Sequence, residues 1–501
     1  MRAEQLQRFA VILTLIGVSC FAGLHLSPLF DPGEGAIAEA SLAMATSGAY
    51  AIPHYDGEPH IHGPILVHWA QAAAMHFLGV HEWVVRLPSG IAAALWILLL
   101  FLFARRALDA AAAFAAPVFL LGAVQVSTMA RAATADAFLS LFITGALLAW
   151  WRYFESHQRG WLLVAYAAMA LGFLAGGLIA VLIPVGTVAL FAWTTGNFRA
   201  TLRASVSWAG IAIFAAVAMP WQLYALSQQG MTLFAPGMGE TAERSGSILS
   251  FLPVLLLGLL PFTAVLIHTL RFTQIDRRLP LARFCMVWFV ATVVLVMLLP
   301  AQAPGDIVHA YPALALLMAR RLPDLRHDHW LVLPGLMLLS FLVLLPWLLA
   351  PAALLFEDPF TRLVLAQAYD DLPVGFTWAI FSGALILGLL MIAQTLTRET
   401  KIAVTALVVL VLLNFILVPT AGRVMQGPVR EAAHRSMESG EEVVMWGVDN
   451  PSFAFYRGEF TRTSPPVTGE LVFTRMPMLL TLPGSEVVYQ RNGYALARIL
   501  H

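Results

Sequence analysis

Apolar stretches about as long as a bilayer is thick recur along almost the whole chain. About thirteen can be counted, each close to the roughly 20 residues that a helix needs to cross the hydrocarbon core. They lie at residues 9–27, 88–104, 110–127, 135–151, 161–176, 178–194, 206–226, 250–270, 284–300, 307–320, 330–350, 374–396 and 402–420. A water-soluble fold of 501 residues cannot bury a composition that is 59% hydrophobic and only 12% charged. The sequence therefore predicts an all-α integral membrane protein with about 13 transmembrane helices.

Basic residues divide unevenly between the segments that connect these stretches. If the N-terminus is cytoplasmic, 17 of the 29 basic residues lie in inner segments and eight in the tail, and the outer loops before the tail hold only Arg86, Arg131, Arg244 and Arg362. This bias follows the positive-inside rule. We expect a multi-pass protein with a cytoplasmic N-terminus, a retained signal anchor at residues 9–27, and residues 28–87 and the tail on the outer side.

The last eighty or so residues have a different character. Charged residues return, and short runs typical of strands appear between Gly and Pro residues. These runs are 442–446, 453–456, 471–473, 487–489 and 494–499. We predict two domains, a transmembrane domain at 1–420 and a small α+β domain at 421–501.

Residues 28–87 form the longest polar-bearing stretch in the first four hundred residues. They hold six of the fourteen histidines and six carboxylates. The start Asp31-Pro32-Gly33-Glu34 is typical of a helix N-terminus, with Asp31 as N-cap, Pro32 in the first turn and Glu34 closing a capping box. We predict helices lying at the membrane surface over 35–47 and 64–78.

This stretch resembles the first periplasmic loop of the bacterial lipid A aminoarabinose transferases, which are related to the protein O-mannosyltransferases. The matching positions, in order, are Glu34, Glu39, Met44, Gly48, Pro53, Gly57, Pro59, Pro64, Trp69, Gly79, Trp83, Arg86, Leu87 and Pro88. Members of that family are inner-membrane enzymes that take a sugar from a polyprenyl-phosphate carrier. The resemblance implies a multispan glycosyltransferase fold, with the first loop and the C-terminal domain in the periplasm.

The reaction that the resemblance implies needs a base for the acceptor hydroxyl and cations for the lipid phosphate. Asp31 and Glu34 are candidate bases, although both are also explained as a helix cap. The family usually has adjacent Asp-Glu, with the Asp as base, where this chain has Gly33-Glu34. Arg131 and Asp136 resemble a family pair at the outer end of a span, as phosphate ligand and catalytic carboxylate. The alternative for these two is a mutual ion pair that anchors the loop.

Other candidates lie further apart in the sequence. Arg244 resembles a family arginine that suits a phosphate ligand, because guanidinium offers a planar fork of donors. His60 and His62 alternate, so an extended segment would present both on one face, where a divalent metal could bind. Two hydrogen-bonded loop histidines are the alternative.

Three lysines that are usual in the family are absent from this sequence. Gly63, Gly176 and Gln302 stand at those three positions, and His62 stands where the family usually has a carboxylate. Asp306, where the family has tyrosine, lies near His309 and could form a replacement acid/base pair.

The sequence supports two hypotheses. One is a glycosyltransferase that moves a sugar from a polyprenyl-phosphate donor to a periplasmic glycolipid or protein. The other is a non-catalytic relative that binds such a headgroup or partners an active enzyme. A transporter is disfavoured, because the charges gather at span ends and not at mid-membrane. No basic patch suggests nucleic acid, and Cys20 and Cys285 lie in apolar spans, unsuited to a disulfide framework.

Overall fold

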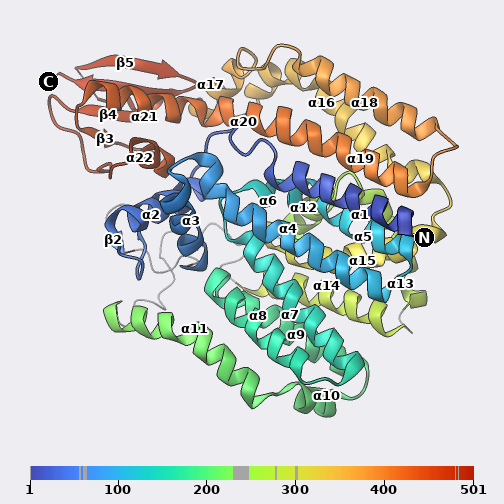
Figure 1. The fold of residues 1–501 in the computed structure, drawn as a ribbon. Coiled ribbons are helices and arrows are strands. Elements are labelled where there is room, and N and C mark those ends of the chain that lie inside the picture. The colour runs from blue at the N-terminus through green and yellow to red at the C-terminus, as the bar shows by residue number, and fades with distance from the viewer. Residues whose placement is uncertain are drawn as a thin grey trace.

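The computed structural model describes residues 2–55, 58–59, 65–229, 248–276, 279–299, 303–479, 481–482 and 484–500. A stack of helices makes up most of the molecule, and a small sheet lies at one end (Figure 1). The helices α2 and α3 lie at the same end as the sheet, and the N-terminus lies at the other. The first loop and the tail thus share one end of the helical stack.

Seven helices among the described residues are long and apolar enough to cross a membrane. They are α1 with its π-helical continuation η1 (Arg2–Ile16 and Gly17–Phe21), α4 (Glu82–Ala107), α7 (Asp136–Ser156), α11 (Trp208–Gln229), α14 (Pro280–Leu298), α16 (Leu333–Ala353), and the continuous run of α19 (Arg398–Leu412), η6 (Leu413–Leu417) and α20 (Val418–Met425). The run from α19 to α20 passes residue 420, so the predicted domain boundary falls inside a helix.

Two further pairs of helices are long and apolar enough only when each pair is taken together, and each pair is bent at a break. The pair α5 (Ala110–Leu121) and α6 (Val124–Arg131) is bent by 62°, and the pair α12 (Ile248–Gly258) and α13 (Thr263–Asp276) by 116°. The breaks meet, because Val124 N–H donates to Leu260 O at 2.9 Å. Inside a membrane a freed backbone group needs such a partner. The contact fixes where α6 begins.

The described helices support seven spans, or nine if each bent pair counts as one. Three other predicted spans coincide with the shorter helices α8 (Gly160–Gly176), α9 (Ile179–Thr194) and α18 (Phe376–Ile392), and a fourth with the 3₁₀ turn η3 (Pro304–Ala310) and α15 (Tyr311–Arg321). The count of thirteen stays a prediction. The remaining helices of the stack are α2 (Gly33–Ser47), α3 (Ile65–Leu78), α10 (Phe198–Ser205) and α17 (Pro359–Gln367), with 3₁₀ turns η4 (Leu322–Asp324) and η5 (Asp328–Leu331).

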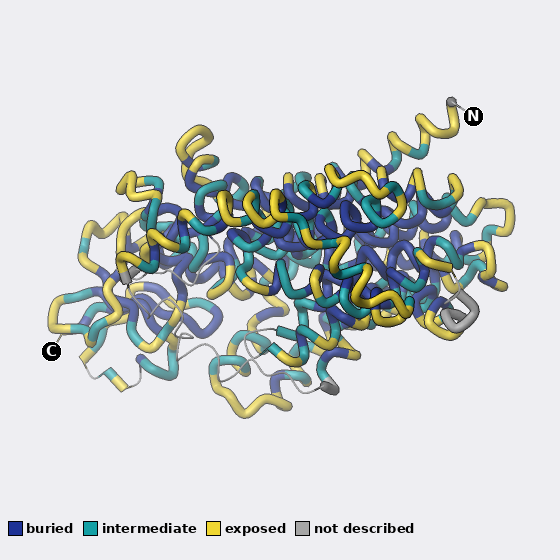
Figure 2. Tube along the Cα trace, turned by 90° about the horizontal axis from the view of Figure 1, so that it is seen from below, coloured by how far each residue is buried: buried dark blue, intermediate teal, exposed yellow. Residues whose placement is uncertain are grey.

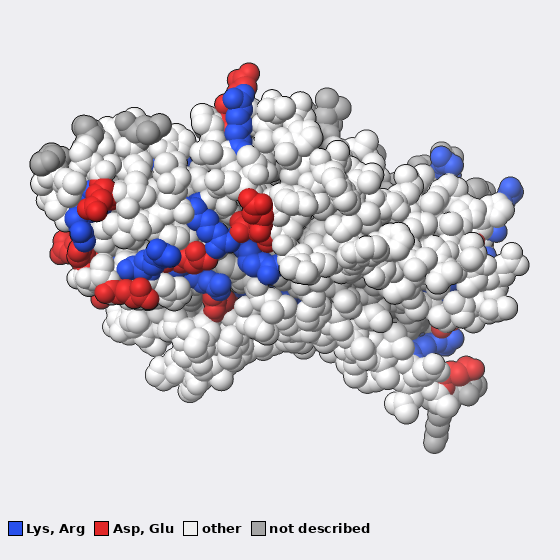
Figure 3. Space-filling view, turned by 90° about the horizontal axis from the view of Figure 1, so that it is seen from above, with Lys and Arg blue, Asp and Glu red and all other residues white. Residues whose placement is uncertain are grey.

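The outside of the helical stack is apolar. Large side chains such as Leu95 and Trp208 are 51% and 82% exposed, and the exposed residues follow the outer faces of the helices (Figure 2). On the face shown in Figure 3, charged residues gather toward the two ends, with an uncharged band between them. Such a band is what lipid tails require. The chain is a multi-pass membrane protein.

The C-terminal part contains a four-stranded sheet in the order β3-β4-β6-β5. Its elements are α21 (Gly427–Ser439), β3 (Val443–Met445), α22 (Pro451–Arg457), β4 (Leu471–Arg475), α23 (Met476–Leu479), β5 (Ser485–Arg491) and β6 (Tyr494–Ile499). Strand β3 is parallel to β4, and the other pairs are antiparallel. A separate two-stranded ribbon, β1 (His54–Tyr55) with β2 (Glu58–Pro59), lies in the first loop.

One predicted strand of this region is wrong. Residues 453–456 form the middle of helix α22, which has Pro451 in its first turn. Phe453 is fully buried and stacks on Phe473 with ring centroids 4.5 Å apart. A proline at the first turn favours a helix start. The aromatic run is apolar because α22 packs on the sheet, not because it joins it.

Candidate functional site

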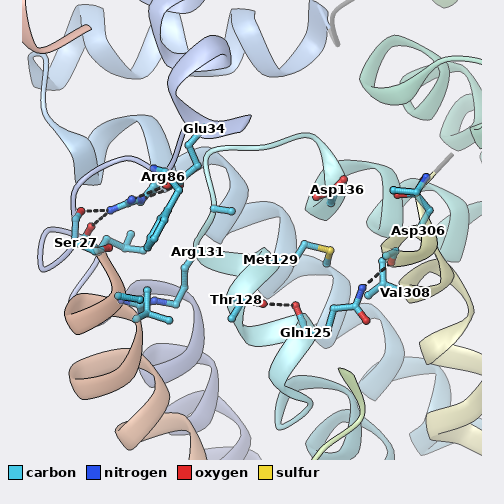
Figure 4. A pocket seen from close by; sticks show the side chains of 17 residues that line it. Ser27, Glu34, Arg86, Gln125, Thr128, Met129, Arg131, Asp136, Asp306 and Val308 are labelled. Carbon is cyan, nitrogen blue, oxygen red and sulfur yellow. Dashed lines mark hydrogen bonds and ion pairs between the residues drawn. The ribbon is translucent and has the colours of Figure 1, made fainter. Parts of the chain in front are cut away.

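A cavity of about 540 Å³ lies where the first loop, α6 and α20 meet. Its walls come from segments far apart in the sequence and are mostly apolar, with Leu24, Phe30, Met129 and Val418 among them. The polar side chains that line it are Ser27, Glu34, Arg86, Gln125, Thr128, Arg131, Asp136 and Asp306 (Figure 4). Its size and its few convergent polar groups are typical of a small-molecule or headgroup site.

Glu34 and Arg86 form a buried ion pair in one wall, with exposed fractions of 4% and 2%. The Arg86 guanidinium donates to both Glu34 oxygens at 2.9 and 2.7 Å, and to three backbone carbonyls between residues 24 and 28. Glu34 also accepts from Phe30 N at 2.9 Å and from Ala133 N at 2.7 Å. This pair joins α2, α4 and the turn before α7, and its hydrogen-bonding capacity is used.

Arg131 occupies the last position of α6 and is 6% exposed. Its Nη1 donates to Ala22 O at 2.5 Å. Among the described residues, no carboxylate lies within ion-pair distance of it. The expected alternative, an ion pair with Asp136, is not formed, since the Asp136 carboxylate accepts instead from the Thr134 hydroxyl at 3.1 Å.

Figure 4 shows Arg86 and Arg131 toward one side of the pocket and Asp136 and Asp306 toward the other. Asp136 is the first residue of α7, where the helix dipole stabilises a negative charge. The Asp306 carboxylate accepts from Ala303 N at 2.8 Å in its own turn. The pocket therefore has a cationic side and an acidic side.

Gln125 joins the two sides of the cavity. Its Nε2 donates to Gly305 O at 2.6 Å, and its Oε1 accepts from the Tyr311 hydroxyl at 2.6 Å. Sequence reasoning missed Gln125 and Thr128 as pocket residues, because neutral side chains in an apolar helix carry no distinctive signal. It also took Arg86 only as part of a motif, although an arginine at the start of an apolar span is costly enough to suggest a partner.

The predicted pair of Asp306 and His309 is not formed. His309 is 1% exposed, does not line the pocket, and its Nδ1 is 2.9 Å from the Ser140 hydroxyl. No hydrogen bond joins its ring to the Asp306 carboxylate. In the 3₁₀ turn η3 the two side chains, three residues apart, have different surroundings.

The prediction that Asp31 caps its own helix is wrong. Helix α2 begins at Gly33, and Glu34 N–H donates to Phe30 O at 2.9 Å. The Asp31 carboxylate instead accepts from Ser452 N at 2.9 Å, from the Ser452 hydroxyl and from Asn450 Nδ2 at 3.1 Å, at the start of α22. Burial raises the pKa of Asp31 to about 6. Asp31 is thus a cap in trans for the C-terminal domain and does not line the pocket.

Several predictions fall outside the described residues. Arg244, His60 and His62 all lie there. Within the described part of the chain, no group of three or more His, Cys, Asp or Glu side chains could hold a metal ion. The metal site and the second phosphate ligand stay predictions.

Two glycines stand where the family pattern has charged residues. A Cβ atom added to Gly33 would meet no other atom within 4 Å, so a larger side chain has room there. A Cβ at Gly176 would come within 2.8 Å of the Leu139 side chain. The space around Gly176 is taken by an apolar neighbour.

Residues 62–224 match the family model described as dolichyl-phosphate-mannose-protein mannosyltransferase. The chain is 26% identical over 338 residues to undecaprenyl phosphate-alpha-4-amino-4-deoxy-L-arabinose arabinosyl transferase 1 of Pseudomonas fluorescens, which covers 64% of this chain and 60% of that protein. It is 27% identical over 373 residues to the corresponding transferase of Pseudomonas paraeruginosa, covering 70% of this chain and 66% of the relative.

Solved structures share the fold across nearly the whole length. ArnT from Cupriavidus metallidurans bound to undecaprenyl phosphate superposes with a TM-score of 0.75 at 20% identity, over 98% of this chain and 97% of that one. The apo state of the same protein gives 0.77. By sequence, the chain matches about 60% of the length of the first curated relatives. The chain is similar in sequence to bacterial undecaprenyl-phosphate aminoarabinose transferases over about two thirds of its length, and it shares the fold of ArnT.

Proposed function

We propose that this protein is an inner-membrane glycosyltransferase that moves a sugar from a polyprenyl-phosphate donor to a glycolipid or protein outside the cytoplasm. One observation carries the proposal. Arg131, a buried guanidinium with no ion-pair partner among the described residues, faces a headgroup-sized pocket whose other side holds Asp136 and Asp306. A buried cation without a counter-ion is costly, and a phosphate would offset that cost.

The two sides of the pocket suit the two halves of the reaction. Arg131 binds the phosphate on the cationic side and stabilises its charge as the sugar departs. On the acidic side, Asp136 takes the proton of the acceptor hydroxyl while the hydroxyl oxygen attacks the anomeric carbon of the sugar. The bond from that carbon to the phosphate oxygen breaks, and polyprenyl phosphate leaves. The displacement inverts the configuration of the sugar.

The other carboxylates fit this reaction less well. Glu34 accepts four hydrogen bonds from Arg86 and backbone groups, so both of its oxygens are already engaged by the protein. Asp31 lies outside the pocket lining and holds α22. Asp306 lines the pocket and is the second candidate base.

A non-catalytic relative is the second candidate function, and one observation favours it. Gly33 stands where the family has its catalytic Asp, and Asp31 does not replace that side chain in the pocket. Such a protein would bind a polyprenyl or glycolipid headgroup without transferring it.

Comparing products in cells separates the two functions. Lipids and membrane proteins would be examined by mass spectrometry from cells that carry the wild type, Asp136→Asn or no copy of the gene. A sugar-modified product that needs the wild type and is lost with Asp136→Asn supports transfer. If Asp136→Asn retains the product, Asp136 is not the base. Should no product depend on the gene, while Gly33→Asp creates one, the non-catalytic function is supported.

The proposed orientation has a test of its own. We expect a cytoplasmic N-terminus, with residues 28–87 and the C-terminal domain in the periplasm. A tag at the C-terminus should be cut by protease added to spheroplasts, and a tag at the N-terminus should be protected. The reverse pattern would contradict the orientation.

A further inference from the structure

Two membrane helices change to π-helical turns where they pass α6. In η1, Ala22 N–H donates to Gly17 O at 2.9 Å, five residues back, and not to Val18 O, four residues back. In η6, Val418 N–H likewise donates to Leu413 O. Such turns are rare and often occur at functional sites, because they leave a carbonyl for another donor.

The side chain of Asn414, in η6, uses the carbonyl that η1 leaves. Its Nδ2 donates to Val18 O at 3.2 Å, and its Oδ1 accepts from the Ser127 hydroxyl of α6 at 3.2 Å. The Ser19 hydroxyl lies 3.4 Å from the Ser127 hydroxyl. Ser19, Ser127 and Asn414 are all fully buried. These three side chains form a polar junction that ties η1, α6 and η6 together inside an apolar stack.

This junction reaches the pocket through Arg131. Ser127 and Arg131 are four residues apart in α6, so their side chains lie on the same face of the helix. On that face, the Ser127 hydroxyl donates to Asn414, and one turn later Arg131 donates to Ala22 O, just beyond η1. Past η6, the same helical run carries Val418 to the pocket wall. Three pocket walls therefore take their relative positions from one junction.

We propose that Asn414 and Ser127 are positioning residues for Arg131. Neither side chain lines the pocket; together they fix how far the guanidinium extends into it, and thus how well it binds a polyprenyl phosphate. This inference rests on the proposed function for its ligand. In enzyme sites, a displacement of about 1 Å in a positioned group lowers the rate on the order of 10²-fold.

The test is a double-mutant cycle on binding of undecaprenyl phosphate to the purified full chain in nanodiscs. We expect Arg131→Gln and Asn414→Leu each to weaken binding about 10-fold, a free-energy change of about 1.4 kcal/mol. The double variant should bind no more weakly than Arg131→Gln alone, because Asn414 acts through Arg131. Additive losses, or unchanged binding by Asn414→Leu, would overturn the proposal.

Two further variants separate positioning from general stability. Ser127→Ala should weaken binding, and Ser127→Thr, which keeps the hydroxyl, should restore it. Thr144→Val removes another buried hydroxyl, the partner of Trp96 Nε1 at 2.7 Å, away from the pocket lining, and should leave binding unchanged. If Thr144→Val weakens binding as much as Ser127→Ala, the junction has only a structural role. These variants also serve if Asn414→Leu does not fold.

The outcomes also separate this inference from the proposed function. Coupled binding without any transfer product would keep the positioning role and refute catalysis. A transfer product together with additive losses of binding in the double-mutant cycle would support catalysis and refute the positioning role. A wild type that does not bind undecaprenyl phosphate would refute both the donor class and the positioning role.

Discussion

Two parts of one pocket wall hold charge in opposite ways. At the junction of Glu34 and Arg86, two buried charges pair and also accept or donate backbone hydrogen bonds on every side. Among the described residues, Arg131 and Asp136 each have one neutral partner, a backbone carbonyl for Arg131 and a hydroxyl for Asp136. The first arrangement builds the pocket, and the second leaves charge available to a ligand.

This difference assigns roles that residue type alone cannot. Removing one partner of a satisfied buried pair strands the other charge, which is costly to the fold. Removing a charge that has no counter-ion does not destabilise the fold and weakens only the binding of the ligand. Four substitutions test the contrast, ordered by the size of the expected effect.

Glu34→Ala should have the largest effect. It leaves the Arg86 guanidinium buried without a counter-ion, which should lower the free energy of unfolding by roughly 3–5 kcal/mol. Thermal unfolding of the purified protein would show the loss. Glu82→Ala, which breaks the longer 3.3 Å contact to the half-buried Arg430, is the matched control and should cost little. Equal losses of stability in Glu34→Ala and Glu82→Ala would contradict the structural role of the Glu34–Arg86 pair.

Asp136→Asn should affect transfer and not folding. Loss of a general base lowers the rate by about 10²- to 10⁴-fold, whereas the amide can still accept from the Thr134 hydroxyl. Initial rates and unfolding midpoints would be measured on the same preparations. Asp306→Asn is the control on the same side of the pocket. A larger loss in Asp306→Asn would move the base to that residue.

Arg131→Gln should reduce transfer by about 10²-fold, the size of effect seen when a single charge-stabilising donor is removed. The unfolding midpoint should stay the same or rise, since the guanidinium is buried without a counter-ion among the described residues. Arg423→Gln provides the control, because Arg423 is exposed and does not line the pocket. A large fall in stability would show that Arg131 has a structural role.

Asp31→Asn should have the smallest effect, and one that depends on pH. Burial raises the pKa of Asp31 from 3.8 to about 6, and the Asp449 carboxylate adds to the shift. Its contribution to stability is therefore fully present below pH 3.8 and is lost as the pH rises through about 6. The unfolding midpoint of Asp31→Asn, relative to wild type, should rise between pH 4.5 and pH 7. A difference that is constant across this range would contradict the shift.

Much of the fold could be predicted from the sequence, because it depends on local patterns. The apolar periodicity predicts the long helices, and α2 and α3 lie close to the predicted 35–47 and 64–78. Four of the five predicted strand runs coincide with β3, β4, β5 and β6. The fifth, at 453–456, is a helix whose cap comes from Asp31, 421 residues away from Ser452. No local pattern carries that information.

The candidate site shows the same limit. The sequence indicates four charged candidates at span ends or family positions, and the fold brings all four to one cavity: Glu34, Arg131, Asp136 and Asp306. The partners of these carboxylates were not predictable. Glu34 is held by Arg86 and Ala133, whereas Asp31, three residues earlier, is held by α22. The neutral residues Gln125 and Asn414 gain their roles entirely from helices that meet in three dimensions.

The most direct test of the central claim is a structure of this protein with undecaprenyl phosphate bound. We predict that the phosphate binds at the Arg131 guanidinium, inside the cavity that Asp136 and Asp306 also line. A phosphate bound instead in the cavity of about 660 Å³ beside Arg8 and Glu399, at the N-terminal end of α1, would contradict it.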